Sequence, residues 1–264
     1  GQTAVPTGLS GVSSIAAGGS HTVVLKNDGT AVEWGNSPPV PAGLSNIISL
    51  SAGKYHTLAL KGDGTVVAWS YDSYNYGQAT VPVGLSGVVA VAAGRYHSLA
   101  LKSDGTVVAW GSNSNGQSTV PTGLSGVIAI SAGDYQSIAL KGDGTVVTWG
   151  VHIYYNGAAG PATAPTGLSG VVAVTAGVDR SIVLKDDATI VIWGSNNRGQ
   201  ATIPAYLSGV AAVSAGKYHS LVLKSDGTVV SWGDNDYEQI TVPAGLSGVV
   251  AISSGYFNSA ALKN

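Results

Sequence analysis

The sequence predicts an all-β chain that folds as a seven-bladed β-propeller of four-stranded antiparallel blades. Its 264 residues repeat one segment pattern, and six tryptophans, at positions 34, 69, 110, 149, 193 and 232, occupy the same place in that pattern. Each copy contains short apolar or β-branched segments separated by turn residues. One such unit cannot bury its own apolar faces, so successive copies must stack. Four antiparallel strands repeated radially form a propeller.

The copy at residues 84–121 shows the expected strands in order. Residues 88–93 are apolar on both faces, which predicts a first strand buried on both faces. Residues 97–102 alternate with period two and form the second strand. Ser103-Asp104-Gly105 then predicts a hairpin, because Asp and Gly tolerate positive φ, and the third strand follows at 106–110. A fourth strand is expected at 117–120, before a proline that suits a strand end.

The two ends of the chain complement each other. Residues 1–6 read as the tail of a unit and residues 246–264 as the head of one, whereas a solenoid, the alternative architecture, would carry polar caps. We therefore expect a single domain over 1–264, with repeat units starting near residues 8, 43, 84, 123, 167, 206 and 245. The seventh unit has no Asp-Gly turn or Trp strand of its own, so we expect a last blade closed by the N- and C-terminal segments and one strand short.

Composition excludes several classes of function. No apolar run approaches the ~18 residues that span a bilayer, which argues against a membrane protein. A net charge of −2 gives no reason to expect nucleic acid as a partner. The chain has no Cys, so it has no disulfide framework, thiolate nucleophile or Cys-based metal site. These features, with a start at Gly1 rather than Met, fit a processed chain at a secreted or cell-surface location.

Positions that agree between the copies predict structural roles. Each Trp is expected in the core. His residues at 21, 56, 97 and 219 share one position, which Gln136, Arg180 and Asn258 fill in the other copies. One such residue in each blade would be spread around a ring, so we expect hydrogen bonds rather than chemistry. Repeated glycines suggest a turn with positive φ; they are at 18, 53, 94, 133, 177, 216 and 255.

Positions that differ between the copies fall in two sets of loops. The first set joins the first and second strands, and five of its seven members place an aromatic residue second: Tyr55, Tyr96, Tyr135, Tyr218 and Phe257. Lys54, Arg95, Arg180 and Lys217 belong to this ring or to its edge. Tyr and Arg are enriched at protein-binding hot spots. The alternative is that these tyrosines only pack against the neighbouring blade.

The second set of loops follows the Trp strand. Residues 70–76 and 151–156 mix Tyr, Ser and Asn, a composition that combines rigid aromatic area with adaptable polar groups. Counting antiparallel strands places both sets of loops at one end of the molecule and the Asp-Gly hairpins at the other.

No enzyme signature emerges, and we expect neither an activity nor a cofactor or metal. Ser98 cannot pair with His97 as nucleophile and base, because adjacent strand residues point to opposite faces. Neither a G-x-S-x-G nor a His-Glu zinc motif is found. Most acidic residues are explained by the hairpins. Asp134 and Asp179 lie near the expected axis, where two carboxylates could serve a glycosidase, the enzyme alternative.

The pattern AGxxHSLALKxDGTVxAWG resembles the repeat of the regulator of chromosome condensation superfamily, whose fold is a seven-bladed propeller. With WGxNxxGQxTVP added, the chain is similar to the propeller-type β-lactamase inhibitory proteins of bacteria. The resemblance covers essentially the whole chain. It implies a partner-binding face of axial loop residues, here Tyr55, Tyr96, Tyr135, Asp179, Tyr218 and Phe257. Tyr74, Tyr154 and Tyr237 are the outer candidates.

Three functions remain open from the sequence. The favoured one is a secreted protein-binding propeller that inhibits a β-lactamase-like enzyme, such as one of class A, through its Tyr-rich loops. The second is a carbohydrate-binding module, because exposed Tyr and Asn also suit glycans. The third is a structural repeat module of a larger surface protein.

Overall fold

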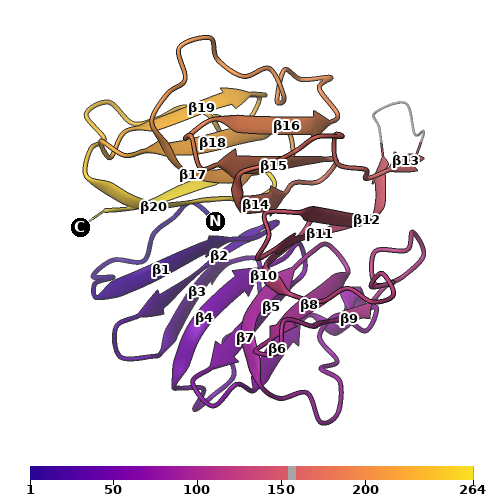
Figure 1. The fold of residues 1–264 in the computed structure, drawn as a ribbon. Coiled ribbons are helices and arrows are strands. Elements are labelled where there is room, and N and C mark those ends of the chain that lie inside the picture. Colours follow the sequence, from indigo (N-terminus) through magenta and orange to yellow (C-terminus); the bar gives the residue numbers. More distant parts are fainter. Residues whose placement is uncertain (154–158, 264) are drawn as a thin grey trace.

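The computed structural model describes residues 1–153 and 159–263, in which antiparallel strands follow one another along the chain (Figure 1). The first strands are β1 (Val12–Ala17), β4 (Ile47–Ala52), β7 (Val88–Ala93), β10 (Val127–Ala132), β14 (Val171–Ala176), β17 (Val210–Ala215) and β20 (Val249–Ser254). The second strands are β2 (His21–Lys26), β5 (His56–Lys61), β8 (His97–Lys102), β11 (Gln136–Lys141), β15 (Arg180–Lys185), β18 (His219–Lys224) and β21 (Ser259–Lys263).

The third strands are β3 (Ala31–Gly35), β6 (Val66–Ser70), β9 (Val107–Gly111), β12 (Val146–Ile153), β16 (Ile190–Gly194) and β19 (Val229–Gly233). A short β13 (Ala159–Pro161) pairs with β12, and η1 (Asp72–Tyr74) is a single 3-10 turn. The described strands form seven sheets: five of three strands, one of four (β10–β13) and one of two (β20–β21). The prediction of an all-β fold is confirmed, and the prediction of four-stranded blades is wrong.

The sheets form a closed ring. Each first strand contacts the first strand of the next sheet, and β1 contacts β20 as well as β4. Figure 1 shows the two ends of this ring side by side, indigo β1 beside yellow β20. The first strands are not buried on both faces as predicted, since Val89 is 52% exposed. Full burial belongs instead to the second strands of the first six sheets, which have a strand on either side; Leu99 and Ala100, for example, are 0% exposed.

The seven repeated glycines line the centre of the ring. None of them has positive φ, so the prediction of a left-handed turn is wrong. A Cβ on each would lie within 3.0 Å of the carbonyl oxygen of the equivalent glycine in the next sheet. This relation runs once around the ring, from Gly18 to Gly53, 94, 133, 177, 216 and 255 and back to Gly18. Only glycine allows the backbones to approach so closely around the axis.

The shared His position forms a second ring of contacts. His56 Nε2 lies 2.9 Å from Ser98 Oγ of the next sheet, and Ser98 Oγ donates to the Gln78 carbonyl oxygen. Because the Ser98 hydroxyl proton is already donated to Gln78, His56 Nε2 must donate its own proton to Ser98 Oγ. The equivalent pairs are His21–Thr57, His97–Ser137, Gln136–Ser181, Arg180–Ser220, His219–Ser259 and Asn258–Thr22. The predicted structural role of this position is confirmed.

Apart from β13 in the fourth sheet, the segments expected as fourth strands are irregular, and in four of them a Gln carbonyl accepts hydrogen bonds from side chains of the next sheet. The Gln117 carbonyl oxygen accepts from Ser137 Oγ and from Trp149 Nε1, both at 2.8 Å. Gln2, Gln78 and Gln200 repeat this double contact. Because these backbone groups bond side chains of the next sheet, residues 117–120 add no strand to their own sheet.

Glu33 takes over this role where the loop after Trp34 is short and rich in proline. Its carboxylate accepts from Trp69 Nε1 at 2.7 Å and from Thr57 Oγ1 at 3.0 Å. Burial raises the pKa of Glu33, while hydrogen bonds from Ser37, Trp69 and Thr57 oppose that rise. One side chain thus replaces a backbone carbonyl and keeps the second sheet attached to the first.

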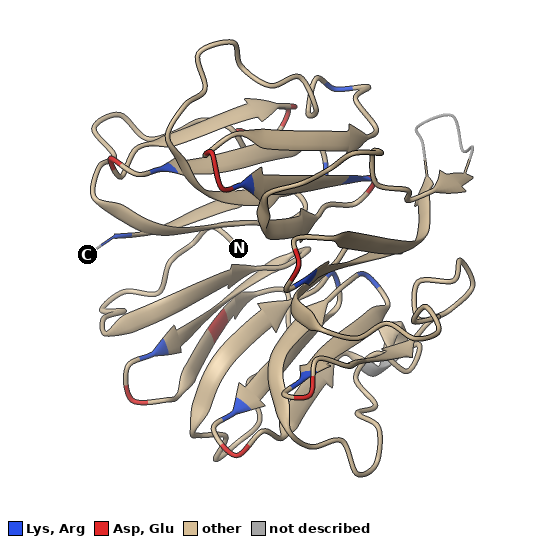
Figure 2. Cartoon of the chain, viewed as in Figure 1, with Lys and Arg blue, Asp and Glu red and all other residues tan. Residues whose placement is uncertain are grey.

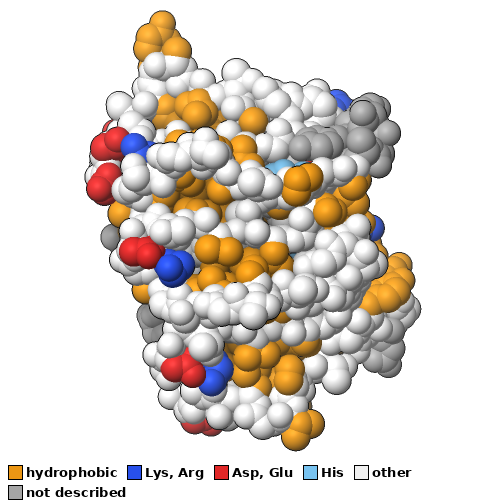
Figure 3. Space-filling view, turned by 45° about the vertical axis from the view of Figure 1, so that its right-hand side comes forward, with side chains coloured by type: hydrophobic (Ala, Val, Ile, Leu, Met, Phe, Trp, Pro, Cys, Tyr) orange, Lys and Arg blue, Asp and Glu red, His pale blue; other side chains and the backbone are white. Residues whose placement is uncertain are grey.

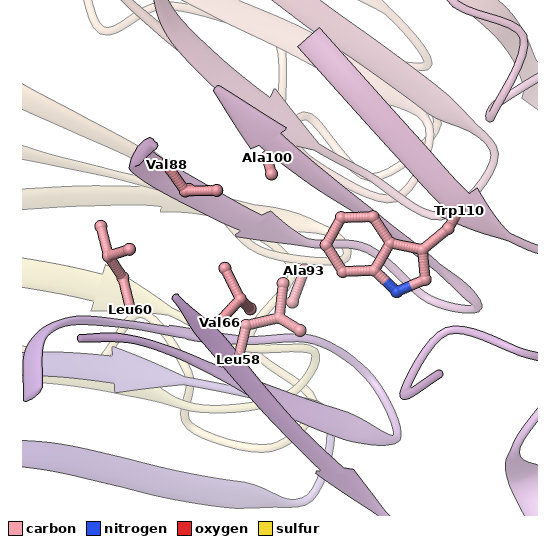
Figure 4. Close-up of a cluster of buried hydrophobic side chains, with 7 residues drawn as sticks. All are labelled: Leu58, Leu60, Val66, Val88, Ala93, Ala100 and Trp110. Atoms are coloured by element: carbon pink, nitrogen blue, oxygen red, sulfur yellow. The ribbon is translucent and has the colours of Figure 1, made fainter. Parts of the chain in front are cut away.

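Each core lies between two neighbouring sheets. Trp110 of β9 points toward Leu58 and Val66 of the preceding sheet, with Ala100 beside it (Figure 4). Trp69, Trp149 and Trp232 are buried to the same degree, whereas Trp34 and Trp193 are half-buried. The expected core role of the Trp series is therefore confirmed for the four buried members.

The Asp-Gly hairpins lie at the outer end of the second strands. Asp104 Oδ1 accepts from the Thr106 backbone, Asp104 Oδ2 accepts from Lys102 Nζ at 2.9 Å, and Gly105 has φ of 76°. Paired Lys and Asp residues recur at these turns and form a row along one edge of the surface (Figures 2 and 3). These exposed ion pairs contribute little stability.

Over the described residues the last sheet has two strands, β20 and β21, one fewer than the three-stranded sheets and two fewer than the expected four-stranded blade. The N-terminal segment does not pair with β21 in a ladder among the described residues, which corrects the expected closure by two paired termini. Residues 1–6 instead lie against the first sheet, where the Gln2 carbonyl accepts from Thr22 and Trp34.

Candidate protein-binding face

Both sets of variable loops meet at one end of the ring, as strand counting predicts. Tyr55, between β4 and β5, stacks on Tyr74, which follows β6, with ring centroids 4.5 Å apart. Tyr96, between β7 and β8, stacks on Tyr55 at 5.1 Å and contacts the edge of Tyr76 at 4.7 Å. We call the surface formed by these two sets of loops the loop face. Four tyrosines from two neighbouring sheets and from both sets of loops thus form one cluster on it.

A second aromatic cluster lies across the ring. Phe257, between β20 and β21, packs on Tyr237, which follows β19, at 4.9 Å, and on Tyr256 at 6.2 Å. Lys217 lies over the rings of Tyr218 and Phe257, at 4.6 Å and 4.8 Å from their centroids.

Basic residues connect the two clusters near the axis. Lys54 Nζ lies 5.0 Å from the Tyr55 ring centroid and 4.7 Å from that of Tyr256. Arg95 lies over Tyr96 and Tyr135 and also donates to the Tyr135 hydroxyl at 2.6 Å. Cation–π contacts of this kind hold long, otherwise mobile side chains against the rings.

A depression opens at the centre of the loop face. It is a cavity of about 350 Å³ lined by Lys54, Arg95, Asp134, Tyr135, Lys217 and Tyr218, among others. Beneath it is a narrow axial cavity of about 70 Å³, lined by the ring glycines and alanines. Any group that enters the centre from outside therefore meets three cations and several phenol rings before it reaches the glycine ring.

Two almost fully buried carboxylates, those of Asp134 and Asp179, lie in the wall of this depression. Asp134 is 3% exposed and lies 3.4 Å from Arg95 Nη1; burial raises its pKa to about 7, while Arg95, Lys54 and Lys217 oppose the rise. Asp179 is 4% exposed, 3.8 Å from Arg180 Nη1, and burial raises its pKa as well. Each carboxylate is thus beside an arginine, as is typical of structural ion pairs.

The predicted site residues are placed as follows. Tyr55, Tyr96, Tyr135, Tyr218, Phe257, Lys54 and Arg95 are half-buried on the loop face, and Tyr74 and Tyr237 are exposed at its rim. Tyr154 lies outside the described residues. Arg180, expected in the ring or at its edge, is fully buried and donates to the backbone of the next sheet. Tyr76 and Tyr256 belong to the clusters and could have been found, because both are aromatic residues within the variable loops.

Two further searches cover the described residues. None of their His, Asp and Glu side chains gather in a group of three that could hold a metal ion. Over the same residues, no helix has the length and apolarity needed to cross a membrane.

Comparison with known sequences identifies the repeat. The profile of the regulator of chromosome condensation (RCC1) repeat matches residues 12–38, 47–78, 88–117, 171–200 and 210–239, more than half of the chain. Each matched segment begins at the first strand of a sheet and continues past the third. No curated protein sequence matches the chain.

Solved structures with a similar fold come from several organisms. Prp20p from Saccharomyces cerevisiae has 18% identity and a TM-score of 0.77, over 94% of this chain and 81% of its own. Human WBSCR16 has 18% identity and a TM-score of 0.77, over 96% and 87%. The ectodomain of the Arabidopsis thaliana receptor kinase ACR4 has 21% identity and a TM-score of 0.72, over 96% and 92%. At these identities the similarity shows the fold alone.

Proposed function

This chain belongs to the regulator of chromosome condensation (RCC1) repeat family, and we propose on that premise that it is a protein-binding propeller of seven blades whose loop face docks another folded protein. Two solved structures of similar fold concern protein binding: Prp20p was studied for its binding to Gsp1p and histones, and it was also crystallised with Kap60. The fold therefore accommodates protein partners, while the contact surface of this chain has to be inferred from its own loops.

The observation that carries the proposal is the joined cluster of aromatic and basic residues on the loop face. Tyr55, Tyr96, Lys54 and Arg95 contact one another or common neighbours, so their side chains have little rotamer freedom left to lose on binding. Rigid aromatic rings with cations between them are the composition of protein-binding hot spots. Packing between blades accounts for the buried edges of these rings, and their outer surfaces remain available.

For the partner we propose a class A β-lactamase-like enzyme and for the protein a secreted inhibitor, since the repeat pattern resembles that of propeller-type β-lactamase inhibitory proteins. Such a partner would place a protruding loop at the central depression, where Lys54, Arg95 and Lys217 favour a carboxylate or a carbonyl group. We expect Tyr55, Tyr96, Tyr135, Tyr218 and Phe257 to contact the partner. Asp179 would support this surface from below.

The test follows chromogenic substrate hydrolysis by a panel of class A β-lactamases against increasing concentrations of the protein. We expect inhibition at or below micromolar concentration. The double substitution Tyr96→Ala and Tyr218→Ala should weaken it by more than about 2 kcal/mol if both are hot spots, which is roughly thirtyfold in affinity. The matched control is Tyr206→Ala, since Tyr206 is 97% exposed but belongs to the connection before β17, beside the hairpin end.

Each outcome of this test decides one part of the proposal. Inhibition that survives the double substitution would remove the loop face from the contact. Absence of inhibition across the panel would reject the β-lactamase partner. A glycan-array signal that Tyr96→Ala abolishes would then assign the same face to carbohydrate.

A further inference from the structure

The central depression of the loop face holds more positive charge than its own carboxylates balance. Three basic and two acidic residues lie in its wall: Lys54, Arg95, Lys217, Asp134 and Asp179. Asp134 pairs with Arg95 at 3.4 Å, and Asp179 lies 3.8 Å from the buried Arg180. Each carboxylate is therefore already matched by an arginine. Lys54 and Lys217 form no ion pair among the described residues, so both ammonium groups remain without a counter-charge.

The two lysines are held at the depression by aromatic rings instead of by carboxylates. Each Nζ lies within 5.0 Å of the centroids of two rings, which are Tyr55 and Tyr256 for Lys54 and Tyr218 and Phe257 for Lys217. Contact with two rings takes the place of part of the hydration of an ammonium group. Burial lowers the pKa of Lys54, the charge of Arg95 lowers it further, and Asp134 opposes this change. A bound anion would relieve the repulsion between these cations.

Two further donors at the depression are buried without an acceptor. The Tyr256 hydroxyl and Arg95 Nε have no hydrogen-bond partner among the described residues. Tyr256 lines both the depression and the narrow axial cavity beneath it. A buried donor without an acceptor destabilises the fold, so an acceptor that enters from outside is favoured at this place.

The size and the walls of the depression favour an organic acid over an inorganic ion. Its volume of about 350 Å³ lies within the range of small-molecule sites. Between the charged groups, the wall presents the rings of Tyr135 and Tyr218 and the side chains of Ile153 and Val178. These surfaces can contact a carbon skeleton, whereas an inorganic oxyanion would leave them in contact with water. Two ammonium groups without counter-charges match a ligand with two carboxylates.

We propose that the central depression is a binding site for a small organic dicarboxylate. One carboxylate accepts from Lys54 Nζ and from the Tyr256 hydroxyl, and the other accepts from Lys217 Nζ. The carbon skeleton lies against the rings of Tyr135 and Tyr218. This inference rests on the lining of the depression and does not require the β-lactamase partner.

The experiment titrates the intact 264-residue chain with succinate and, separately, with glutarate, followed by isothermal titration calorimetry. We expect saturable binding of one ligand per chain and a rise in the melting temperature with ligand concentration. Succinamide, the neutral analogue, should bind about a hundredfold more weakly, which corresponds to about 2.8 kcal/mol. Acetate, which has one carboxylate, should bind about tenfold more weakly or less tightly still.

Variants of the chain assign the binding to the depression. Lys54→Gln and Lys217→Gln each remove one ammonium group, and each should weaken binding by about tenfold or more. Asp134→Asn removes a negative charge beside Arg95 and should strengthen binding by about threefold or more, an effect that a loss of structure would not produce. The matched control Lys102→Gln makes the same charge change at an Asp-Gly hairpin, at the other end of the molecule, and should leave binding unchanged.

Absence of binding at millimolar succinate and glutarate would overturn the proposal, as would undiminished binding by Lys217→Gln. Equal affinity for acetate would overturn the dicarboxylate assignment and would indicate a site for a single carboxylate, such as an acidic side chain of a protein. The titration contains no partner protein, so its result is independent of the β-lactamase assay. Binding of the diacid without inhibition rejects only the docking proposal, and inhibition without binding of the diacid rejects only this site.

Discussion

Replacing Gly94 by alanine tests the glycine ring that closes the fold. The φ of Gly94 is not positive, so alanine fits its backbone conformation. The added Cβ would nevertheless lie 2.5 Å from the Gly133 carbonyl oxygen and as close to the ring of His97. Overpacking of this kind costs about 1–3 kcal/mol. Displacing the Gly133 carbonyl also weakens its hydrogen bond from Arg95 N, at 3.2 Å, which contributes about 1 kcal/mol. We expect a total loss of about 2–4 kcal/mol.

The matched control is Gly84→Ala, where φ is +81° and no atom lies within 4 Å of the new Cβ. That substitution is costly only because alanine must adopt the left-handed backbone conformation, which costs about 1–2 kcal/mol. Urea unfolding compares the two variants, and thermal unfolding should show a drop of about 2–4 °C for each kcal/mol lost. If Gly94→Ala is no more destabilising than Gly84→Ala, close approach of the backbones is not the reason for glycine at this position, and the account of the ring is wrong.

Two further predictions concern the buried polar contacts. Burial lowers the pKa of all five histidines, to about 3 for His56 and to about 4 for the others, namely His21, His97, His152 and His219. Unfolding therefore takes up protons below pH 6.5, and the free energy of unfolding should fall between pH 6.5 and pH 4. The raised pKa values of Asp134, Glu33 and Asp179 act in the opposite direction and offset part of this fall. His97→Gln should make this fall in the free energy of unfolding smaller, as measured by urea unfolding across the same pH range. Glutamine already occupies the equivalent position of the next copy, as Gln136. An unchanged pH dependence would show that buried His97 does not contribute to the fall. Trp110→Phe removes the hydrogen bond to the Gln78 carbonyl and should lower the free energy of unfolding by about 1–3 kcal/mol. Trp193 Nε1 has no hydrogen-bond partner among the described residues, so Trp193→Phe should cost less. Equal losses of stability in thermal melts of the two variants would contradict this interpretation.

The copies preserve contacts between sheets while they change the groups that make them. Arg180 stands at the His position and still bonds Ser220 of the next sheet, at 3.2 Å. Glu33 uses a side chain where other copies use a Gln carbonyl. The loop residues differ from copy to copy, whereas these contacts between sheets recur.

The candidate site was partly predictable for the same reason. Tyr55, Tyr96, Tyr218 and Phe257 stand out because the repeat aligns the copies and shows where they differ. The direction of the strands alone predicts that these residues lie at the same end of the molecule as the loops after the third strands. The stacking of Tyr55 on Tyr74 agrees with that prediction. The burial of Asp179 and Arg180 was not predictable, because it depends on how far each side chain extends toward the next sheet.

The sequence by itself determined the all-β class, the repeat, the strand order within each unit, the hairpins and the end at which the variable loops gather. These are local properties, set by side-chain alternation and by turn residues. Only the tertiary structure decided that the ring glycines serve close approach and that residues 117–120 supply carbonyls instead of a strand. Each of these depends on the distance between neighbouring sheets, which no single repeat unit specifies, because it is fixed only when seven sheets pack around one axis.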